Sequence, residues 1–259
     1  MNTLHDYLKT LKLSKMAEVL DQELARAEKE KCPTKEVLER LFGLEVAALM
    51  ERRIERRIRD SKLPERKLLA DFDFKFQTGL DQKQVMDLAT LGFIHRKEWL
   101  LMAGCSGTGK SHIAKALLLI ACKENFRCRY TTASDMLQTL LSGLADGSLE
   151  LKLKSYIRPE VLLIDEIGFD RLEQNDARKA SLFFKVVEAR YCKNTTILTT
   201  NIDFKVLGEY LGDPVVTTAL LDRLVHHAII INIDGPSYRM HESKALNRKK
   251  KNETPILTR

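Results

Sequence analysis

The sequence predicts an α/β fold in which a mainly parallel five-stranded sheet is flanked by helices and preceded by a small all-helical region. Two observations support this prediction. Apolar residues recur at helical spacing over roughly the first ninety positions, and from about residue 98 short β-rich runs alternate with helical stretches. The β-rich runs are continuously apolar rather than alternating. Such runs are typical of parallel strands covered on both faces.

Two amphipathic helices are predicted in the helical region. The apolar positions of the first, set among charged residues, are Leu4, Leu8, Leu11, Val19, Leu20 and Leu24. A Cys-Pro-Thr sequence at 32–34 interrupts the pattern and offers Thr34 as an N-cap for the second helix. The buried stripe expected in that helix comprises Val37, Leu38, Leu41, Leu44, Ala48, Ile54 and Ile58.

The predicted strands and the changes in sequence pattern define the expected domains. The strands cover residues 99–103, 128–132, 161–165, 195–200 and 228–233. Between the two regions, the segment DFDFKFQTGL breaks the helical pattern and is interpreted as a linker or strap with aromatic anchors. We therefore expect a helical domain over 1–70, an α/β domain over 71–243 and a basic tail over 244–259.

Composition restricts the class of protein. The 259 residues carry a formal net charge of +7, of which +5 lies in residues 244–259, so the remainder carries only +2. A content of 44% hydrophobic and 31% charged residues argues against intrinsic disorder. No stretch approaches the roughly 20 apolar residues of a membrane span, and no signal-peptide pattern is evident. We expect a cytoplasmic protein that does not interact with membranes and whose five cysteines are reduced.

The strongest chemical signal is GCSGTGKS at 104–111, which satisfies the P-loop pattern G-x-x-x-x-G-K-[ST]. An apolar strand precedes it and a helical stretch follows, as this motif requires. Glycines let backbone N–H groups surround a phosphate, Lys110 reaches the β- and γ-phosphates, and the Ser111 hydroxyl binds Mg²⁺. The ATP-binding residues expected here are Gly104, Cys105, Ser106, Gly107, Thr108, Gly109, Lys110, Ser111 and His112.

Two carboxylates end the apolar run VLLIDE at 161–166. At this position relative to a P-loop, Asp165 is expected to hold Mg²⁺ together with Ser111, while Glu166 orients or deprotonates the attacking water. An acidic pair at a strand end also occurs in ordinary loops. A small-molecule kinase, the less favoured alternative, would need the hydroxyl of its acceptor where Glu166 offers a base.

The run TTILTTN delivers Asn201 to the point where a neighbouring strand would meet the γ-phosphate. Taken alone, Asn201 is equally consistent with a simple strand-end cap. Together with the preceding motifs, however, the pattern resembles the AAA+ ATPases, whose corresponding residue is called sensor 1. The resemblance assigns that role to Asn201.

The flanking sequences resemble a narrower group, the IstB-type helper ATPases that are encoded beside a transposase and are related to DnaC-type helicase loaders and DnaA-type initiators. The resemblance extends from about residue 4 to 241 and includes LHDYLKTLKLSKMAEVLDQEL, LATLGFIHRKEWLLMAG and DPVVTTALLDRLVHHAIIINIDGPSYRM. It implies ATP-dependent assembly of a ring, spiral or filament on double-stranded DNA, target selection and stimulation of a partner transposase. A DnaC-type replicative helicase loader is the alternative.

The resemblance also assigns two arginines. Arg223 in LLDRL matches the arginine finger that completes the ATP site of a neighbouring subunit; the alternative is a surface pair with Asp222. Arg239 in GPSYR matches a sensor 2-like arginine that binds ATP within its own subunit. We expect no full C-terminal lid domain of the kind that normally follows an AAA+ core.

Candidate DNA contacts fall in two basic clusters. One lies near the end of the second predicted helix and the other in an insertion at 134–158, which is predicted to form two helices and resembles that of the initiator and loader branch. Solvated helix faces would show the same composition. Contacts to DNA phosphates rather than base edges are expected. The residues are Arg52, Arg53, Arg56, Arg57, Lys152, Lys154 and Arg158.

Overall fold

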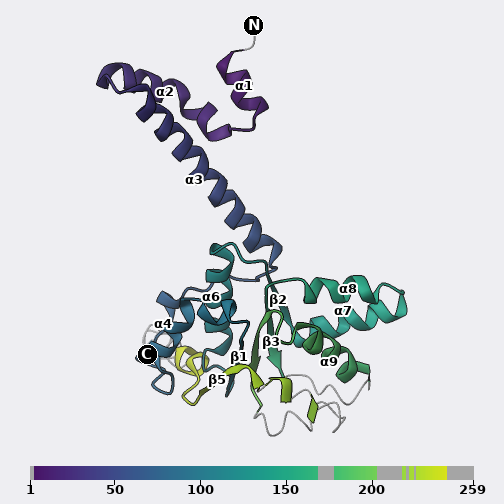
Figure 1. The fold of residues 1–259 in the computed structure, drawn as a ribbon. Coiled ribbons are helices and arrows are strands. Elements are labelled where there is room, and N and C mark those ends of the chain that lie inside the picture. Colours follow the sequence, from purple (N-terminus) through teal and green to yellow (C-terminus); the bar gives the residue numbers. More distant parts are fainter. Residues whose placement is uncertain (1–2, 169–177, 203–217, 220–221, 225, 244–259) are drawn as a thin grey trace, which may run out of the picture. The chain divides into compact units, whose positions relative to one another are not determined.

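The structure, a computed structural model, describes residues 3–168, 178–202, 218–219, 222–224 and 226–243. The chain divides into two compact units, residues 1–56 and 57–259 (Figure 1). This division falls inside one helix, whereas the sequence pattern places the change of domain at residue 70. The predicted basic tail at 244–259 lies outside the described residues. No described helix is long and apolar enough to cross a membrane.

The helical unit contains α1 (Leu4–Thr10), α2 (Ser14–Glu30) and most of α3 (Thr34–Asp60). The prediction of a single first helix is wrong, because the chain turns between α1 and α2. Lys12 adopts a left-handed conformation with φ of 58°, and the Leu13 N–H bonds the Leu8 carbonyl at 2.9 Å. This bond closes a Schellman-type C-terminus. Lysine has no special preference for that conformation, so periodicity gives no warning of the break.

A small core joins the three helices of this unit. Its buried members are Leu8, Met16, Leu20, Val37 and Leu41. Val37, Leu41 and Ile58 of the predicted α3 stripe are buried, but Leu38 and Leu44 are exposed. The stripe prediction is therefore wrong at those two positions, because α1 and α2 cover only one side of α3.

Glu45 lies on the buried side of α3, although it was not part of the predicted stripe. Its Oε2 accepts hydrogen bonds from the backbone N–H groups of Lys15 at 2.6 Å and Met16 at 2.9 Å, near the N-terminus of α2. Its Oε1 pairs with Arg52 at 2.8 Å. Burial opposes ionisation, but these bonds outweigh it and lower the pKa of Glu45. A buried carboxylate thus fixes α2 to α3.

The α/β unit is built on a parallel sheet with the strand order β2-β3-β4-β1-β5. All five predicted strands are confirmed, and the first and third extend slightly further than expected. Because every strand is parallel, the carboxyl ends of β1, β3 and β4 lie at one edge of the sheet. The strands are β1 (Trp99–Gly104), β2 (Cys128–Thr132), β3 (Val161–Ile167), β4 (Thr195–Thr200) and β5 (Ala228–Ile233).

Helices cover both faces of this sheet (Figure 1). One face packs Leu101, Ile164 and Leu198 against α7, α8 and α9. On the other, α6 contacts β1, β3 and β4. The helices whose bounds the structure describes are η1 (Leu69–Asp71, a 3₁₀ turn), α4 (Gln82–Ala89), α5 (Gly92–His95), α6 (Lys110–Lys123), α7 (Ala133–Ala145), α8 (Leu149–Ile157) and α9 (Arg178–Arg190).

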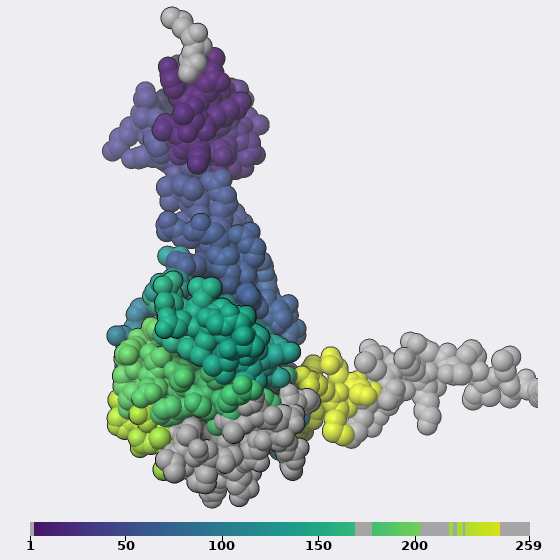
Figure 2. Space-filling view, turned by 90° about the vertical axis from the view of Figure 1, so that its right-hand side faces the viewer, coloured from purple at the N-terminus to yellow at the C-terminus, as the bar shows by residue number. Residues whose placement is uncertain are grey.

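A buried arginine fixes the α7–α8 insertion to the sheet. The Arg190 guanidinium donates hydrogen bonds to the carbonyls of Tyr156, Ile157 and Pro159 at 2.7–3.1 Å and to the Thr196 hydroxyl at 2.9 Å. Burial lowers the pKa of Arg190 to about 9. The end of α8 is therefore held in place, while the surface of the insertion faces solvent (Figure 2).

Candidate nucleotide-binding site

The P-loop connects β1 to α6 at the carboxyl edge of the sheet. Gly107 and Gly109 have φ of 82° and 101°, a region that L side chains rarely adopt. A Cβ at Gly107 would lie 2.2 Å from the Ser237 Oγ, and one at Gly109 would lie 2.4 Å from Phe72 Cε2. Glycine is needed at both positions for its conformation and for close packing. The N–H groups that begin α6 meet the turn, as expected for an anion-binding loop.

Lys110, the first residue of α6, lies inside this turn. Its Nζ donates hydrogen bonds to the carbonyl oxygens of Gly104 and Cys105, each at 2.6 Å. The side chain is almost fully buried, and this desolvation lowers the pKa of Lys110. The nearby carboxylate of Asp165 acts in the opposite direction and favours the charged form. The ammonium group is therefore held where it can reach a phosphate in the loop.

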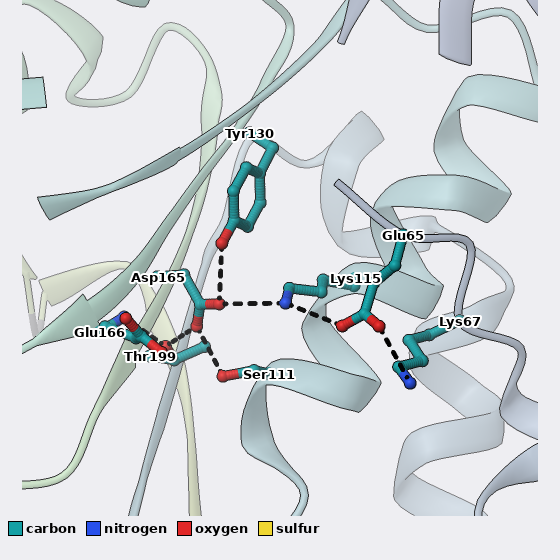
Figure 3. A network of polar contacts seen from close by, with 8 residues as sticks. All are labelled: Glu65, Lys67, Ser111, Lys115, Tyr130, Asp165, Glu166 and Thr199. Carbon is teal, nitrogen blue, oxygen red and sulfur yellow. Dashed lines mark hydrogen bonds and ion pairs between the residues drawn. The ribbon is translucent and has the colours of Figure 1, made fainter. Parts of the chain in front are cut away.

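Asp165, at the end of β3, lies in a polar cluster (Figure 3). Its Oδ1 accepts hydrogen bonds from the Ser111 hydroxyl at 2.8 Å and from the Thr199 hydroxyl. Its Oδ2 accepts a longer bond, 3.3 Å, from the Tyr130 hydroxyl and lies 3.8 Å from the Lys115 Nζ. Burial, reinforced by the Asp165 charge, raises the pKa of Tyr130. The Asp165 carboxylate is thus buried among hydroxyl groups, and its ion pair with Lys115 is long, at 3.8 Å.

The Ser111 hydroxyl and the Asp165 carboxylate fit a magnesium site. Both are hard oxygen donors and lie 2.8 Å apart beside the P-loop. Within the described residues, no group of three or more His, Cys, Asp or Glu side chains forms an all-protein metal cage. Magnesium in nucleotide sites commonly takes one or two protein ligands together with phosphate oxygens and water. The chain therefore offers the partial donor set that this metal requires.

Glu166 is directed away from the sheet by a local irregularity in β3. The register between β3 and β4 shifts between Ile164 and Ile167, and Glu166 has a φ of 63°. A bulge of this kind changes the direction of a side chain, and the left-handed conformation is strained for a non-glycine residue. The Thr199 hydroxyl accepts the Glu166 N–H at 3.0 Å. The result is an exposed carboxylate directly after the buried Asp165.

A cavity of about 660 Å³ collects most of the predicted site residues. Ser106 to His112 line it, together with Glu166, Asn201 and Arg239. Gly104 and Cys105 are not among the lining residues, although their carbonyls accept the Lys110 hydrogen bonds. Asn201 lies beyond the end of β4, the strand next to β3, as its sequence position predicts. The structure thus brings Glu166 and Asn201 to the same cavity as the P-loop.

The sequence interpretation missed how the strap covers this cavity. Gln77 is buried and its Nε2 donates to the Thr108 carbonyl at 2.9 Å. The Phe72 ring packs edge-on against His112, at 5.5 Å between ring centres. Phe76 packs similarly against Tyr238 at 5.3 Å. The aromatic residues of the strap were recognisable as anchors, but spacing alone could not reveal that they lie on the P-loop.

A chain of charges connects the segment between α3 and η1, which precedes the strap, to the Asp165 cluster. Glu65 Oε1 pairs with the Lys115 Nζ at 3.1 Å, and Glu65 Oε2 pairs with Lys67 at 3.1 Å (Figure 3). Hydrogen bonds from Lys67 and then Lys115 lower the pKa of Glu65. Lys115 thus lies between two carboxylates, Glu65 from the segment before the strap and Asp165 from β3.

Arg223 lies outside the cavity of its own chain. Its Nη1 donates to the Ala219 carbonyl at 2.9 Å, and its Nη2 lies 3.6 Å from Glu188. The guanidinium also lies over the Phe184 ring, 5.1 Å from its centre. The sequence offered a pair with Asp222 as the alternative to a finger role; the ion pair present is with Glu188.

Comparison with known proteins gives the family. The profile of the IstB-like ATP binding proteins matches residues 6–245. The chain belongs to this family. Its relatives include the ATP-binding protein of insertion sequence IS5376 from Geobacillus stearothermophilus, 38% identical over 96% of this chain and 98% of the relative. That of IS21 from Pseudomonas aeruginosa is 36% identical over 99% of this chain and 96% of the relative.

Solved structures support the fold of this IstB-like protein. AMPPCP-bound DnaA from Aquifex aeolicus superimposes with a TM-score of 0.53 at 20% identity, covering 73% of this chain and 57% of that one. DnaI superimposes with a TM-score of 0.55 at 21% identity, covering 65% and 92%. The α/β unit thus has the P-loop AAA+ fold. The protein is an ATP-binding protein of the type associated with IS21-family insertion sequences, and its family implies ATPase activity.

The basic residues near the end of α3 have different surroundings. Arg52 pairs with the buried Glu45, and Arg57 donates to the Asn125 side chain at 3.2 Å. Arg53 and Arg56 are exposed on the helix surface. Stabilising contacts therefore account for Arg52 and Arg57, whereas Arg53 and Arg56 remain candidates for DNA contact.

The insertion in this IstB-like protein shows a similar division. Lys152 pairs with Asp146 at 2.7 Å and donates to the Ser142 hydroxyl at 3.1 Å, which fastens α8 to α7. Lys154 is exposed and 3.9 Å from Glu150, and Arg158 is exposed at the C-terminus of α8. Lys154 and Arg158 are thus the more available candidates.

Proposed function

We propose that this protein is a magnesium-dependent, DNA-stimulated ATPase that oligomerises on double-stranded DNA and assists a partner transposase. The cavity that joins the P-loop to Glu166 is the observation that carries the enzymatic part of the proposal. The insertion-sequence relatives, which match the chain from end to end, carry the biological part. They favour a transposition helper over a helicase loader, because the likeness to DnaI concerns the fold alone.

In the proposed reaction, the P-loop binds the phosphates, and residues at the strand ends bind the metal and activate the water. Lys110 and the loop N–H groups hold the β- and γ-phosphates, and Ser111 and Asp165 hold Mg²⁺. When bound, the metal neutralises negative charge on the phosphate oxygens. Glu166 accepts a proton from the attacking water, which Asn201 helps to orient.

The strap supplies binding rather than chemistry. Phe72 and His112 close one side of the cavity, while Phe76 and Tyr238 offer aromatic surface to an adenine ring. Arg239, which also lines the cavity, contacts phosphate within the same subunit. Because this enclosure excludes water from the phosphates, electrostatic contacts inside it gain strength.

Arg223 acts in a neighbouring subunit. Its position outside its own cavity and its partial exposure support this role. In the assembled state its guanidinium leaves Glu188 and offsets charge on the transferred phosphoryl group. Hydrolysis therefore depends on assembly, and DNA that gathers subunits stimulates it.

Exposed basic side chains contact the DNA backbone. Arg53 and Arg56 on α3 and Lys154 and Arg158 at α8 are the preferred candidates. Such contacts release counterions, so affinity for duplex DNA falls by orders of magnitude between low and moderate salt if several phosphates are bound. A flat salt response would contradict a backbone-dominated grip.

A subunit-mixing experiment tests the central proposal. Glu166→Gln lacks the base and Arg223→Ala lacks the finger, so each protein alone hydrolyses ATP poorly in the presence of duplex DNA. Mixing them creates interfaces in which Glu166 of one subunit meets Arg223 of the other, and DNA-stimulated turnover returns in part. Failure of the mixture to exceed the sum of its components would reject the shared site.

The transposition role needs its own measurement. We expect strand transfer by the partner transposase to rise when the protein, ATP and duplex target are added together. The Lys110→Ala variant, which cannot hold the phosphates, serves as the matched control. Equal strand transfer with and without the wild-type protein would contradict the helper role.

A further inference from the structure

Two lysines of α6 line the nucleotide cavity, and they have different partners. Lys110 donates to the carbonyl oxygens of the P-loop. The Lys115 Nζ instead lies between two carboxylates, 3.1 Å from Glu65 Oε1 and 3.8 Å from Asp165 Oδ2. The Lys115 side chain is only 12% exposed, so solvent screens these contacts weakly. Lys115 therefore places a positive charge directly beside a candidate metal ligand.

The two oxygens of Asp165 face different groups (Figure 3). Its Oδ1 accepts the Ser111 hydroxyl at 2.8 Å, whereas its Oδ2 faces the Lys115 ammonium. Ser111 and Lys115 are four residues apart, which places them on the same face of α6. At 3.8 Å the Lys115 contact is too long for a hydrogen bond. The hydroxyl groups of Ser111, Tyr130 and Thr199 orient the carboxylate instead, so Lys115 acts on it through charge.

This charge has opposite effects on the two forms of the site. Asp165 is about 1% exposed, and a buried carboxylate without a cation nearby is costly. Lys115 reduces that cost in the protein without metal. In the metal-bound form the same ammonium repels Mg²⁺, because two cations then share one carboxylate. Glu65 limits this repulsion, since it holds Lys115 over a shorter distance than Asp165 does.

We propose that Lys115 is a positioning residue that acts through Asp165 and keeps the Mg²⁺ affinity of the nucleotide site low, while Glu65 limits this effect by drawing the ammonium away. The site then holds Mg²⁺ mainly when nucleotide phosphates add their own negative charge, and releases it with the product. This inference rests on the proposed function, because it requires a magnesium-dependent nucleotide site. It adds to that function two residues that touch neither the substrate nor the attacking water.

Nucleotide binding without hydrolysis gives the first test. A fluorescent, non-hydrolysable ATP analogue is bound to the full chain at increasing Mg²⁺, with EDTA as the metal-free reference. Lys115→Met keeps the length of the side chain but removes its charge, so the Mg²⁺ concentration for half-maximal binding falls at least about fivefold. Glu65→Gln releases the ammonium toward Asp165 and raises that concentration about threefold. A rise in both variants, as general damage to the site would give, or no change in either, would overturn the proposal.

Matched variants separate charge from other effects at Lys115. Lys115→Arg keeps the positive charge, so its Mg²⁺ requirement stays within about twofold of wild type. Lys123→Met removes a charge from an exposed position of the same helix that does not line the cavity, and leaves the requirement unchanged. If Lys115 instead contacted a phosphate, Lys115→Met would weaken binding in EDTA. A loss in EDTA larger than the gain with Mg²⁺ would reject the proposal.

The double variant tests whether Glu65 acts through Lys115. Once Lys115→Met has removed the ammonium, adding Glu65→Gln changes the Mg²⁺ requirement by less than about 1.5-fold. An equal effect of Glu65→Gln in both backgrounds would show that Glu65 acts on the metal directly and would reject its assigned role. A wild-type protein whose nucleotide affinity ignored Mg²⁺ would reject the proposed magnesium-dependent function, and this inference with it. A normal wild-type response without opposite shifts in the two single variants rejects this inference alone.

Discussion

In the α/β unit, apolar side chains from β1, β3 and β4 meet helices on both faces of the sheet and are almost fully buried. Among residues 3–56 of the helical unit, ten large apolar side chains are exposed and five form the buried core. An apolar pattern therefore has two different outcomes in this chain. In the α/β unit it predicts residues that the unit buries by itself, whereas in α3 many apolar residues at helical spacing lie on the surface.

The two units also differ in how they surround a buried carboxylate, Glu45 in the helical unit and Asp165 in the α/β unit. Glu45 and Asp165 are each about 1% exposed. Glu45 is neutralised by Arg52 and two backbone N–H groups, so its bonds are complete and its role is structural. Asp165 receives hydroxyl bonds and stands 3.8 Å from its nearest lysine, which leaves it suited to a metal cation. What surrounds a buried charge, rather than burial itself, separates a functional carboxylate from a structural one.

The largest effect is expected at Glu166. Glu166→Gln keeps the size and backbone of the bulge but removes the base, so DNA-stimulated ATP turnover falls by about 10²–10⁴-fold. ATP binding persists because Lys110 and the P-loop are unchanged. Steady-state phosphate release and nucleotide binding measure the two effects separately.

Glu124→Gln is the matched control for this substitution. Glu124 is exposed at the C-terminus of α6 and is not a lining residue of the nucleotide cavity, so turnover stays at the wild-type rate. If Glu166→Gln also left turnover unchanged, another group would have to be the base.

The next largest effect is expected when a buried leucine of the α/β unit is shortened, in comparison with an exposed leucine of α3. Leu117→Ala in α6 removes a fully buried side chain and costs about 2–5 kcal/mol of unfolding free energy. Leu38→Ala in α3, where the side chain is 47% exposed, costs less than about 0.5 kcal/mol in dilute solution. Denaturant titrations measure both.

The single tryptophan allows the unfolding of the α/β unit to be followed separately from that of the helical unit. Trp99 is buried in the α/β unit, so its fluorescence follows that unit, while circular dichroism at 222 nm includes the helical unit. A dilute Leu38→Ala protein as destabilised as Leu117→Ala would show that the α3 stripe is covered within a single chain.

The same contrast explains how far sequence alone predicts this protein. The five strands and the P-loop were predictable because parallel strands and phosphate loops impose local composition on contiguous residues. The break at Lys12 was not, because a left-handed lysine has no local signature. Gln77 and Tyr130 were missed because their roles depend on contacts between distant segments, the strap with the P-loop and β2 with β3.

A smaller effect is expected at Glu45. Its folded-state pKa is lowered, so ionised Glu45 stabilises the helical unit above the unfolded value near 4.3. That contribution is lost as the pH falls through the folded pKa. Glu45→Gln costs about 1.5–3 kcal/mol at neutral pH, since it weakens charge-assisted bonds to Arg52 and the start of α2.

The measurement is the pH dependence of helical-unit stability. The wild-type protein loses stability below about pH 4.3 more steeply than Glu45→Gln does, because the variant has no proton to gain at this position. Glu39→Gln, on the exposed side of the same helix, keeps the wild-type slope to within experimental scatter. Identical slopes for wild type and Glu45→Gln would show that the carboxylate does not supply this stability.

The smallest effect is expected at Tyr130. This residue contacts Asp165, the buried carboxylate of the α/β unit. Its hydroxyl donates to Asp165 over 3.3 Å, a long bond that orients the carboxylate only weakly. Tyr130→Phe therefore raises the Mg²⁺ concentration for half-maximal turnover by less than about fivefold, which corresponds to about 1 kcal/mol. Thr199→Val raises it more, because the Thr199 hydroxyl bonds Asp165 and also accepts the Glu166 N–H. If the order of the two variants were reversed, Asp165 would depend on β2 rather than β4 for its orientation.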